Sequence, residues 1–314
     1  MLGFLIRRFL TAIVSVVLAS LVVFSALLAV PGDPAAVILG MNSTPEARAA
    51  LRTRLGLDEP PATRYVGWLG GVVRGDFGES LNYQRPVAGL IGERLRVSVP
   101  LALGAALVAC LLAFPLGIFA ANRRGTFWDP LVTALSQLGA AIPSFWLGLI
   151  FILYFAVELR WLPASGFVPF GEDPVRWVRS LILPVLALGL GQAAVMTRMT
   201  RAAMLDVLSQ DFVRTAKAKG VAQRGVVMKH ALRNAMVTII TILGLSLSNV
   251  FIGSIVVEQV FSLPGLGRLA LTAIGTRDFP LLQGEILIYA ATIVFLGFLV
   301  DVSYGLLDPR IRYS

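Results

Sequence analysis

The residues best suited to bind another molecule lie in one basic segment, residues 211–234, with the sequence DFVRTAKAKGVAQRGVVMKHALRN. It contains the chain's three lysines, Lys217, Lys219 and Lys229, and its one histidine, His230. Lysine and arginine act here as positive charges that attract acidic groups on a partner. Such a concentration of charge is too costly for the interior of a bilayer, so the segment must lie in water. Because long apolar stretches flank it, we interpret it as a docking surface for a soluble partner.

Other kinds of chemistry are excluded by the residue types. A zinc, haem or iron–sulfur site needs several Cys or His ligands, and the chain has one of each. The cysteine, Cys110, lies in an apolar stretch and is interpreted as a small buried hydrophobe. The sequence contains no Walker-type phosphate-binding loop. We therefore predict no metal site, no disulfide within the chain and no ATP site of that type.

The composition is that of a membrane protein. The chain is 57% hydrophobic and 14% charged, with a mean hydropathy of +0.80, whereas a soluble domain carries about a quarter charged residues. The net charge of +9 could indicate nucleic-acid binding. In a membrane protein it is better explained by basic loops next to anionic lipid headgroups, so we expect lipid and no nucleic acid as a partner.

Six apolar segments are long enough to cross the bilayer as helices, which takes about 20 residues. They are residues 9–30, 97–121, 131–157, 181–196, 237–257 and 286–307. The third is interrupted by Pro143 and the fourth is the shortest. The predicted fold class is an all-α membrane protein with six transmembrane helices. Its divisions are an N-terminal helix (1–30), a small extracytoplasmic subdomain (31–96) and a five-helix core (97–314) with a cytoplasmic loop at 198–236.

The positions of arginine predict the orientation. Arg7 and Arg8 precede the first span, and Arg123 and Arg124 follow the second. Six alternating spans put these residues, the basic segment and the C-terminal arginines on one side. Both termini are therefore predicted to be cytoplasmic. The first apolar run exceeds the roughly 15 residues of a signal-peptide core, so we interpret it as an uncleaved anchor.

Ionisable residues are scarce within the predicted spans. Glu158 and Glu258 fall at span ends, and Asp301 lies in the last third of the sixth span, close enough to the cytoplasmic face to meet lipid headgroups or Arg310. The polar mid-span residues, which we interpret mainly as helix–helix contacts, are Gln192, Ser246, Ser248 and Asn249. Ion-coupled transporters usually keep ionisable groups in mid-span. Energy for transport is therefore expected to come from another subunit.

The segment 31–96 is predicted to be ordered. A helix over residues 44–57 is indicated by Thr44 as its cap and Gly56 at its end. An amphipathic helix and a turn follow, at residues 62–73 and 75–80. The subdomain either contacts an external partner or caps the helix bundle, and both alternatives stay open.

The basic segment is predicted to form helices separated by a glycine. Residues 199–210 continue the fourth span, residues 212–219 form a short helix that Gly220 ends, and a helix resumes over 221–231. Small side chains on the short helix, Thr215, Ala216 and Ala218, would let another surface approach. An apolar patch of Val226, Val227 and Met228 lies between basic residues. The alternative is a solvated loop with no partner, which the length and helical pattern disfavour.

At these residues the sequence resembles the inner-membrane permeases of binding-protein-dependent ABC importers. The hallmark of that family is a cytoplasmic loop with two small residues after an acidic one, and a glycine beyond three further residues. Arg214, Thr215 and Ala216 fall in the first three places here, and Gly220 falls in the last. Arginine at the acidic place resembles the RTAxAKG variant of the branch that carries peptides and nickel.

Shorter pieces similar to that branch extend along the whole chain. They are PGDP (31–34), LGLDEPP (55–61), GDFGES (75–80), IPSFWLGL (142–149), WLPASG (161–166), HALRNA (230–235), VEQVFSLPGLGRL (257–269), RDFPLLQG (277–284) and LLDPRIRY (306–313). Each piece alone is a weak signal, whereas all of them in the same order are specific.

The resemblance implies a type I ABC-importer permease fold in the bacterial inner membrane, and a subunit that is not an enzyme. It implies a second homologous permease, two cytoplasmic ATPase subunits that hold ATP and Mg, and an extracytoplasmic solute-binding protein. This chain itself would need no cofactor. The ATPase-docking residues that the match implies are Asp211, Phe212, Arg214, Thr215, Ala216, Lys217, Ala218, Lys219 and Gly220.

The branch implies di- or oligopeptides as the substrate, with nickel complexes, glutathione or another small solute as alternatives. Bare nickel would need His or carboxylate ligands along its path, and few are present. That scarcity favours peptides. A stand-alone channel or secondary transporter is a remoter alternative, because gating or coupling groups in mid-span are scarce.

Overall fold

The computed structural model describes residues 2–29, 35–36, 43–54 and 57–307. Within these ranges the regular elements are helices, and the extended pairing is a single bridge between Glu79 and Pro86. The PGDP motif, the predicted helix end at Gly56 and Arg310 lie outside the described residues.

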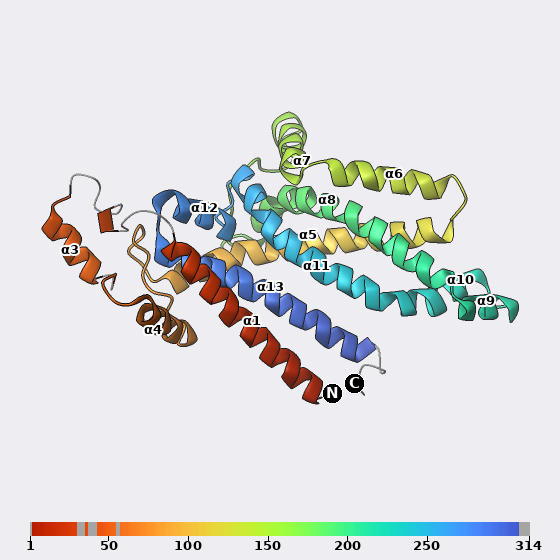
Figure 1. Ribbon diagram of the computed structural model, residues 1–314. Helices are drawn as coiled ribbons and strands as arrows, with labels where there is room; N and C mark the ends of the chain where they lie inside the picture. The colour runs from red at the N-terminus through yellow and green to blue at the C-terminus, as the bar shows by residue number, and fades with distance from the viewer. Residues whose placement is uncertain (1, 30–34, 37–42, 55–56, 308–314) are drawn as a thin grey trace. The chain divides into compact units, whose positions relative to one another are not determined.

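Among the described residues, five helices are long and apolar enough to cross a membrane: Gly3–Leu28, Val87–Asn122, Pro174–Leu208, Gln223–Val260 and Phe279–Gly305. They correspond to α1 (Leu2–Leu28), α5 (Val87–Asn122), α8 (Pro174–Leu208), α11 (Leu232–Val260) with the short helices before it, and α13 (Phe279–Leu307). Figure 1 shows their course. Helix α1 covers the first predicted span as far as Leu28, and each of the other four contains one predicted span, which it extends at one or both ends.

The remaining predicted span is broken. Helix α6 (Trp128–Ala141) and helix α7 (Ser144–Phe151), which continues as the π-helical turn η1 (Ile152–Glu158), meet at an angle of 90°. Ile142 is extended, with φ −81° and ψ 120°, because the residue before a proline is disfavoured in the helical region. The bent pair, counted as one span, completes the predicted six.

The chain divides into two compact units, each built from segments distant in sequence. The first contains residues 1–9, 98–264 and 295–314, and the second contains residues 10–97 and 265–294. Long helices such as α5 contribute to both units. The predicted divisions at residues 30 and 96, which rest on hydropathy and orientation, remain predictions.

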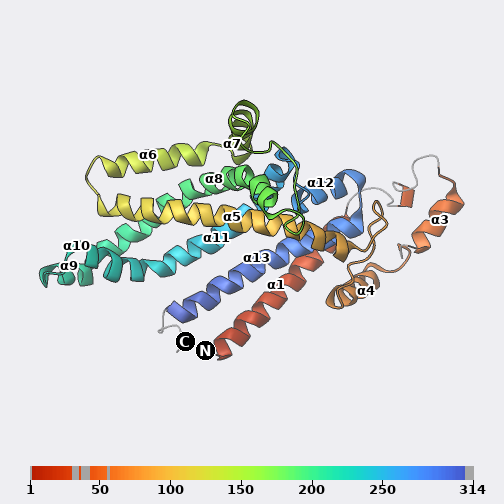
Figure 2. The same ribbon diagram turned by 180° about the vertical axis from the view of Figure 1, so that it is seen from behind.

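The first unit is a bundle in which α5, α6, α8 and α11 run alongside one another (Figures 1 and 2). Close approach of α5 and α8 depends on Gly117, where an added Cβ would come within 2.8 Å of the Thr200 Cβ. Helix α8 begins where the Asp173 carboxylate accepts hydrogen bonds from the Val175 and Arg176 amides, both at 3.0 Å. This cap stabilises the end of α8 distant from the basic segment.

The second unit contains α3 (Pro45–Arg54), α4 (Pro61–Val73) and α12 (Leu266–Thr276). The predicted cap of α3 is confirmed, since the Ala47 amide donates to Thr44 Oγ1 at 3.3 Å. Two of the short motifs meet here: Ser80 Oγ donates to Asp278 Oδ2 at 2.5 Å, and Asp278 Oδ1 accepts from the Leu281 amide at the start of α13. The extracytoplasmic role of residues 31–96 remains a prediction.

The expectation of nearly uncharged spans needs correction. Helix α13 begins at Phe279, earlier than predicted, because the Asp278 carboxylate caps it. Glu285 therefore lies inside the helix, fully buried. Glu258, near the end of α11, is also fully buried and accepts a hydrogen bond from Ser98 Oγ at 2.6 Å. Asp301 pairs with Arg8 at 3.0 Å.

Candidate coupling site

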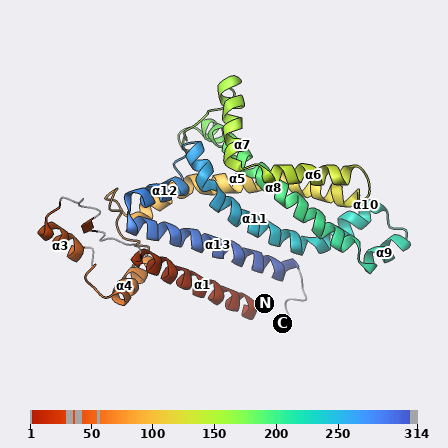
Figure 3. The same ribbon diagram turned by 45° about the horizontal axis from the view of Figure 1, so that its top comes forward.

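The predicted short helix is present as α9 (Asp211–Ala218), which follows α8 after a two-residue link. That link is tight, since the Ser209 amide donates to Leu205 and the Gln210 amide donates to Val207. Figures 1 and 3 show α9 and α10 (Gln223–Gly225) at the end of α8 and α11 within the first unit. The chain thus turns from the long helix α8 directly into the basic segment.

Gly220 ends α9, as predicted. Its φ is +79°, in the left-handed region that favours glycine. The Gly220 amide donates to the Lys217 carbonyl at 2.9 Å, and the Val221 amide donates to the Ala216 carbonyl at 3.2 Å. These two bonds form a Schellman motif, which satisfies the last carbonyls of the helix. Any side chain at this position would strain the backbone.

One face of α9 packs against the bundle. Val213 is fully buried and Ala216 nearly so, and both contact Val226, with Leu208 of α8 alongside. Positions 213 and 216 are three residues apart, so they lie on the same face of the helix. Ala216 is therefore a packing residue, and its small size allows α9 to approach the bundle. The other predicted docking residues are exposed: Asp211, Phe212, Arg214, Thr215, Lys217, Ala218, Lys219 and Gly220.

The proposed apolar patch after Gly220 is mostly wrong. Val226 and Val227 are buried, and only Met228 is exposed, at 53%. The chain here forms a π-helical turn, η2 (Val226–Ala231), before α11 begins. Val227 and Ala231 pack against Met204 and Val207 of α8. Val226 therefore packs against α9, and Val227 packs against α8.

The exposed face of α9 is cationic. Arg214 Nη1 lies 3.5 Å from Asp211 Oδ1, and the two side chains are 77% and 95% exposed. A pair this exposed contributes little to stability. Lys217 and Lys219 extend the positive surface toward Gly220. This face can bind an acidic surface, whereas the helix holds no group arranged for catalysis.

A cavity of about 210 Å³ lies beside α9. The ends of α5 and α8 line it, together with Lys217 of α9 and Gln223 of α10. Gln223 Nε2 donates to Asn122 Oδ1 at 2.8 Å. This bond attaches the start of α10 to the end of α5. The two residues are 101 positions apart, so the sequence alone did not predict the contact.

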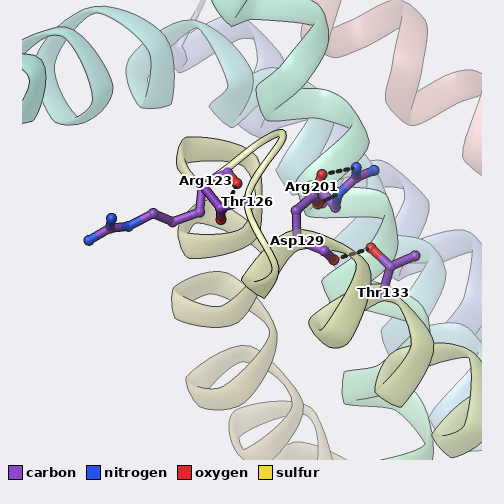
Figure 4. Close-up of polar contacts among 5 residues, drawn as sticks. All are labelled: Arg123, Thr126, Asp129, Thr133 and Arg201. Carbon is purple, nitrogen blue, oxygen red and sulfur yellow. Dashed lines mark hydrogen bonds and ion pairs between the residues drawn. The ribbon is translucent and has the colours of Figure 1, made fainter.

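The sequence also gave no indication of an ion pair between α6 and α8. Arg201 Nε donates to Asp129 Oδ1 at 2.5 Å and Arg201 Nη2 donates to Asp129 Oδ2 at 2.9 Å. Figure 4 shows both bonds, with Thr133 Oγ1 donating to the Asp129 carbonyl. Thr126, in the turn before α6, donates to the Arg123 carbonyl at 2.7 Å. The one available signal was the Asp129 carboxylate, two residues before the predicted span at 131–157.

No metal centre is formed by the part of the chain that the structure describes: no three His, Cys, Asp or Glu side chains come together there. The candidate site is the exposed, cationic face of α9, whose opposite face packs on the helix bundle.

Comparison with known proteins identifies the family to which this chain belongs. Residues 113–313 match the family described as binding-protein-dependent transport system inner membrane component, and residues 1–102 match the N-terminal region described for such membrane components. The chain is 40% identical over 314 residues, 100% of both chains, to a protein of Brucella abortus (strain 2308) named as a peptide transport system permease. It is equally 40% identical over 314 residues, again 100% of both, to the glutathione transport system permease protein GsiC of Escherichia coli (strain K12).

Its fold is similar to that of a chain in the inward-facing MetNI methionine ABC transporter. The TM-score is 0.57 at 17% sequence identity, over 70% of this chain and 96% of that chain. This likeness concerns the fold, which is that of type I importer permeases. From the family match and the apolar helices, the chain belongs to the binding-protein-dependent transport system inner-membrane components, as a multi-pass permease of an ABC importer.

Proposed function

We propose that this chain pairs with a second homologous permease to form a translocation path for di- or oligopeptides, and that the exposed face of α9 docks on an ATPase subunit. ATP and Mg are held by two such ATPase subunits, and a solute-binding protein delivers the substrate on the opposite side. Both termini and α9 lie in the cytoplasm, and residues 31–96 lie outside.

The observation that carries the docking assignment is the two-sided construction of α9. Val213 and Ala216 fix the helix to the bundle, while Arg214, Lys217 and Lys219 lie exposed on it. A helix used only to connect two spans needs no such packing. A helix that receives force from a partner must be attached firmly to the spans that it moves.

The names of the relatives support peptides as the substrate class. One relative is named for peptide transport and another for glutathione, itself a modified tripeptide. Both match this chain over its full length. A glutathione-like or other small peptide therefore fits the proposal, and a nickel complex is the second candidate.

The docking assignment can be tested with two matched charge reversals. Arg214 on α9 and Arg176 at the other end of α8 each pair with an aspartate three residues earlier, at 3.5 and 3.3 Å, and are 77% and 74% exposed. Arg214→Glu should weaken retention of the ATPases in the purified complex by about tenfold, because like charges would then face each other. Arg176→Glu should leave retention unchanged. Equal retention in both variants would overturn the docking assignment.

A further inference from the structure

Helices α6 and α8 run in opposite directions, and several side-chain contacts hold them together. Asp129 contacts Arg201, Gln137 accepts a hydrogen bond from Arg198, and an added Cβ on Gly139 would lie 3.0 Å from the Ala194 Cβ. As residue numbers rise along α6, they fall along α8. The two helices are therefore antiparallel and in register over most of α6.

The ion pair between Asp129 and Arg201 is largely enclosed. The two side chains are 10% and 24% exposed, and two parallel hydrogen bonds join them. A bidentate guanidinium–carboxylate contact fixes orientation as well as distance. Removing one partner would leave an enclosed charge without its counter-ion, which is strongly unfavourable. The pair therefore resists any sliding of α6 along α8.

Arg201 lies on the part of α8 that leads into the candidate docking helix. About two helical turns separate it from Leu208, where α8 ends. Met204 and Val207, in those turns, pack against Val227 and Ala231. Leu208 packs against Val213 and Ala216 of α9. A displacement of α9 would therefore act on the segment of α8 that carries Arg201.

Helix α6 is also connected to the basic segment through α5, the helix that precedes it. The turn between α5 and α6 is short, with Gly125 at φ +80° and the Thr126 amide donating to Arg123 at 3.0 Å. The Asn122–Gln223 bond attaches the end of α5 to α10. Beyond α6, Gly148 of α7 packs on Phe261, whose ring would lie 2.9 Å from an added Cβ. Helix α7, which follows α6, is thus packed against the residue that ends α11.

We propose that Asp129 and Arg201 are positioning residues for energy coupling: their ion pair makes α6 move together with α8 when the ATPases displace α9. The proposal rests on the proposed function of α9. Without the pair, the ATPases still bind and hydrolyse ATP, but α6 no longer follows α8.

The test uses the complete complex in proteoliposomes, with both permeases and the ATPases. Nitroxide labels are placed at Leu135 on α6 and Met199 on α8, both exposed, after the Cys110→Ala replacement. Pulsed EPR measures the distance between the labels without nucleotide and after trapping with ATP and vanadate. With the pair intact, the distance should be the same in both states. In Asp129→Asn it should change between the states by about 2 Å or more, the scale of helix shifts in switching proteins.

Two further variants make the result decisive. The double exchange Asp129→Arg with Arg201→Asp should restore the constant distance, whereas Asp301→Asn, which breaks the Arg8 pair at 3.0 Å, should not alter it. A constant distance in assembled Asp129→Asn complex would overturn the proposal, even if less complex were recovered, because the pair would then serve stability alone. ATPase retention in Arg214→Glu separately tests the docking assignment, so failure of either idea is recognised by itself.

Discussion

The two ends of α8 carry nearly the same exposed charge pattern but differ in what lies beneath it. At one end Arg176 pairs with Asp173, and beyond the other end Arg214 pairs with Asp211. The first pair belongs to a capped helix start whose nearby Val175 is exposed. The second belongs to a separate helix whose Val213 and Ala216 are buried. The exposed charge is therefore the same at both places, and what sets the proposed docking helix apart is the buried residues beneath the charge.

The largest effect should come from removing that packing. Val213→Asp places a carboxylate in a site with no exposed surface, at a cost of about 3 kcal/mol or more. We expect α9 to detach, the ATPases to be lost from the purified complex and the melting temperature to fall. Val175→Asp, on a side chain that is exposed at the other end, is the control and should change neither. Normal ATPase retention in Val213→Asp would show that packing is irrelevant to docking.

A smaller effect is expected from straining two glycine turns, one after α9 at Gly220 and one in the loop before α8 at Gly166. Gly220 and Gly166 have φ of +79° and +93°, and an added Cβ at either would meet nothing within 4 Å. Valine at each should therefore cost a similar 1–3 kcal/mol of backbone strain. Only Gly220→Val should uncouple ATP hydrolysis from uptake, measured as ATP consumed per glutathione or trialanine taken up. If Gly166→Val uncoupled the complex equally, the special role of the α9 end would be refuted.

The smallest effect is expected in an experiment that needs no substitution, the chemical labelling of the lysines in the native chain. Lys217 and Lys219 are exposed on or next to α9, and Lys229 is exposed in η2. Since these are all the lysines of the chain, amine labelling followed by peptide mass spectrometry reports each separately. We expect binding of the ATPases to slow labelling of Lys217 and Lys219 severalfold, because docking excludes solvent. Equal labelling with and without the ATPases would argue against contact at this face.

Much of this architecture was predictable from local patterns. Hydropathy located the spans, Pro143 predicted the break in the third, and Gly220 predicted the end of α9. These features depend on neighbouring residues, so the sequence displays them directly. The start of α13 was not predicted correctly. It depends on the Asp278 carboxylate, which also accepts a hydrogen bond from the Asn82 amide, and Asn82 is far away in the chain.

The contacts that organise the site were not predictable in this way. Asp129 and Arg201 are 72 positions apart, and nothing in either local sequence identifies the partner. The inward direction of Ala216 and Val226 follows from how α9 folds back on α8, which the helical pattern alone leaves open. The family resemblance treated the predicted docking residues as one group, whereas the structure separates the buried Ala216 from the exposed ones.

The break at Pro143 has a consequence for the surroundings of α6. With 14 residues, this helix is about 21 Å long, shorter than the roughly 30 Å of bilayer hydrocarbon. A span that includes it therefore holds non-helical backbone at membrane depth, where peptide groups cannot face lipid and must meet protein or water. The corner at Ile142 should accordingly be turned away from the lipid, toward another subunit or a hydrated passage.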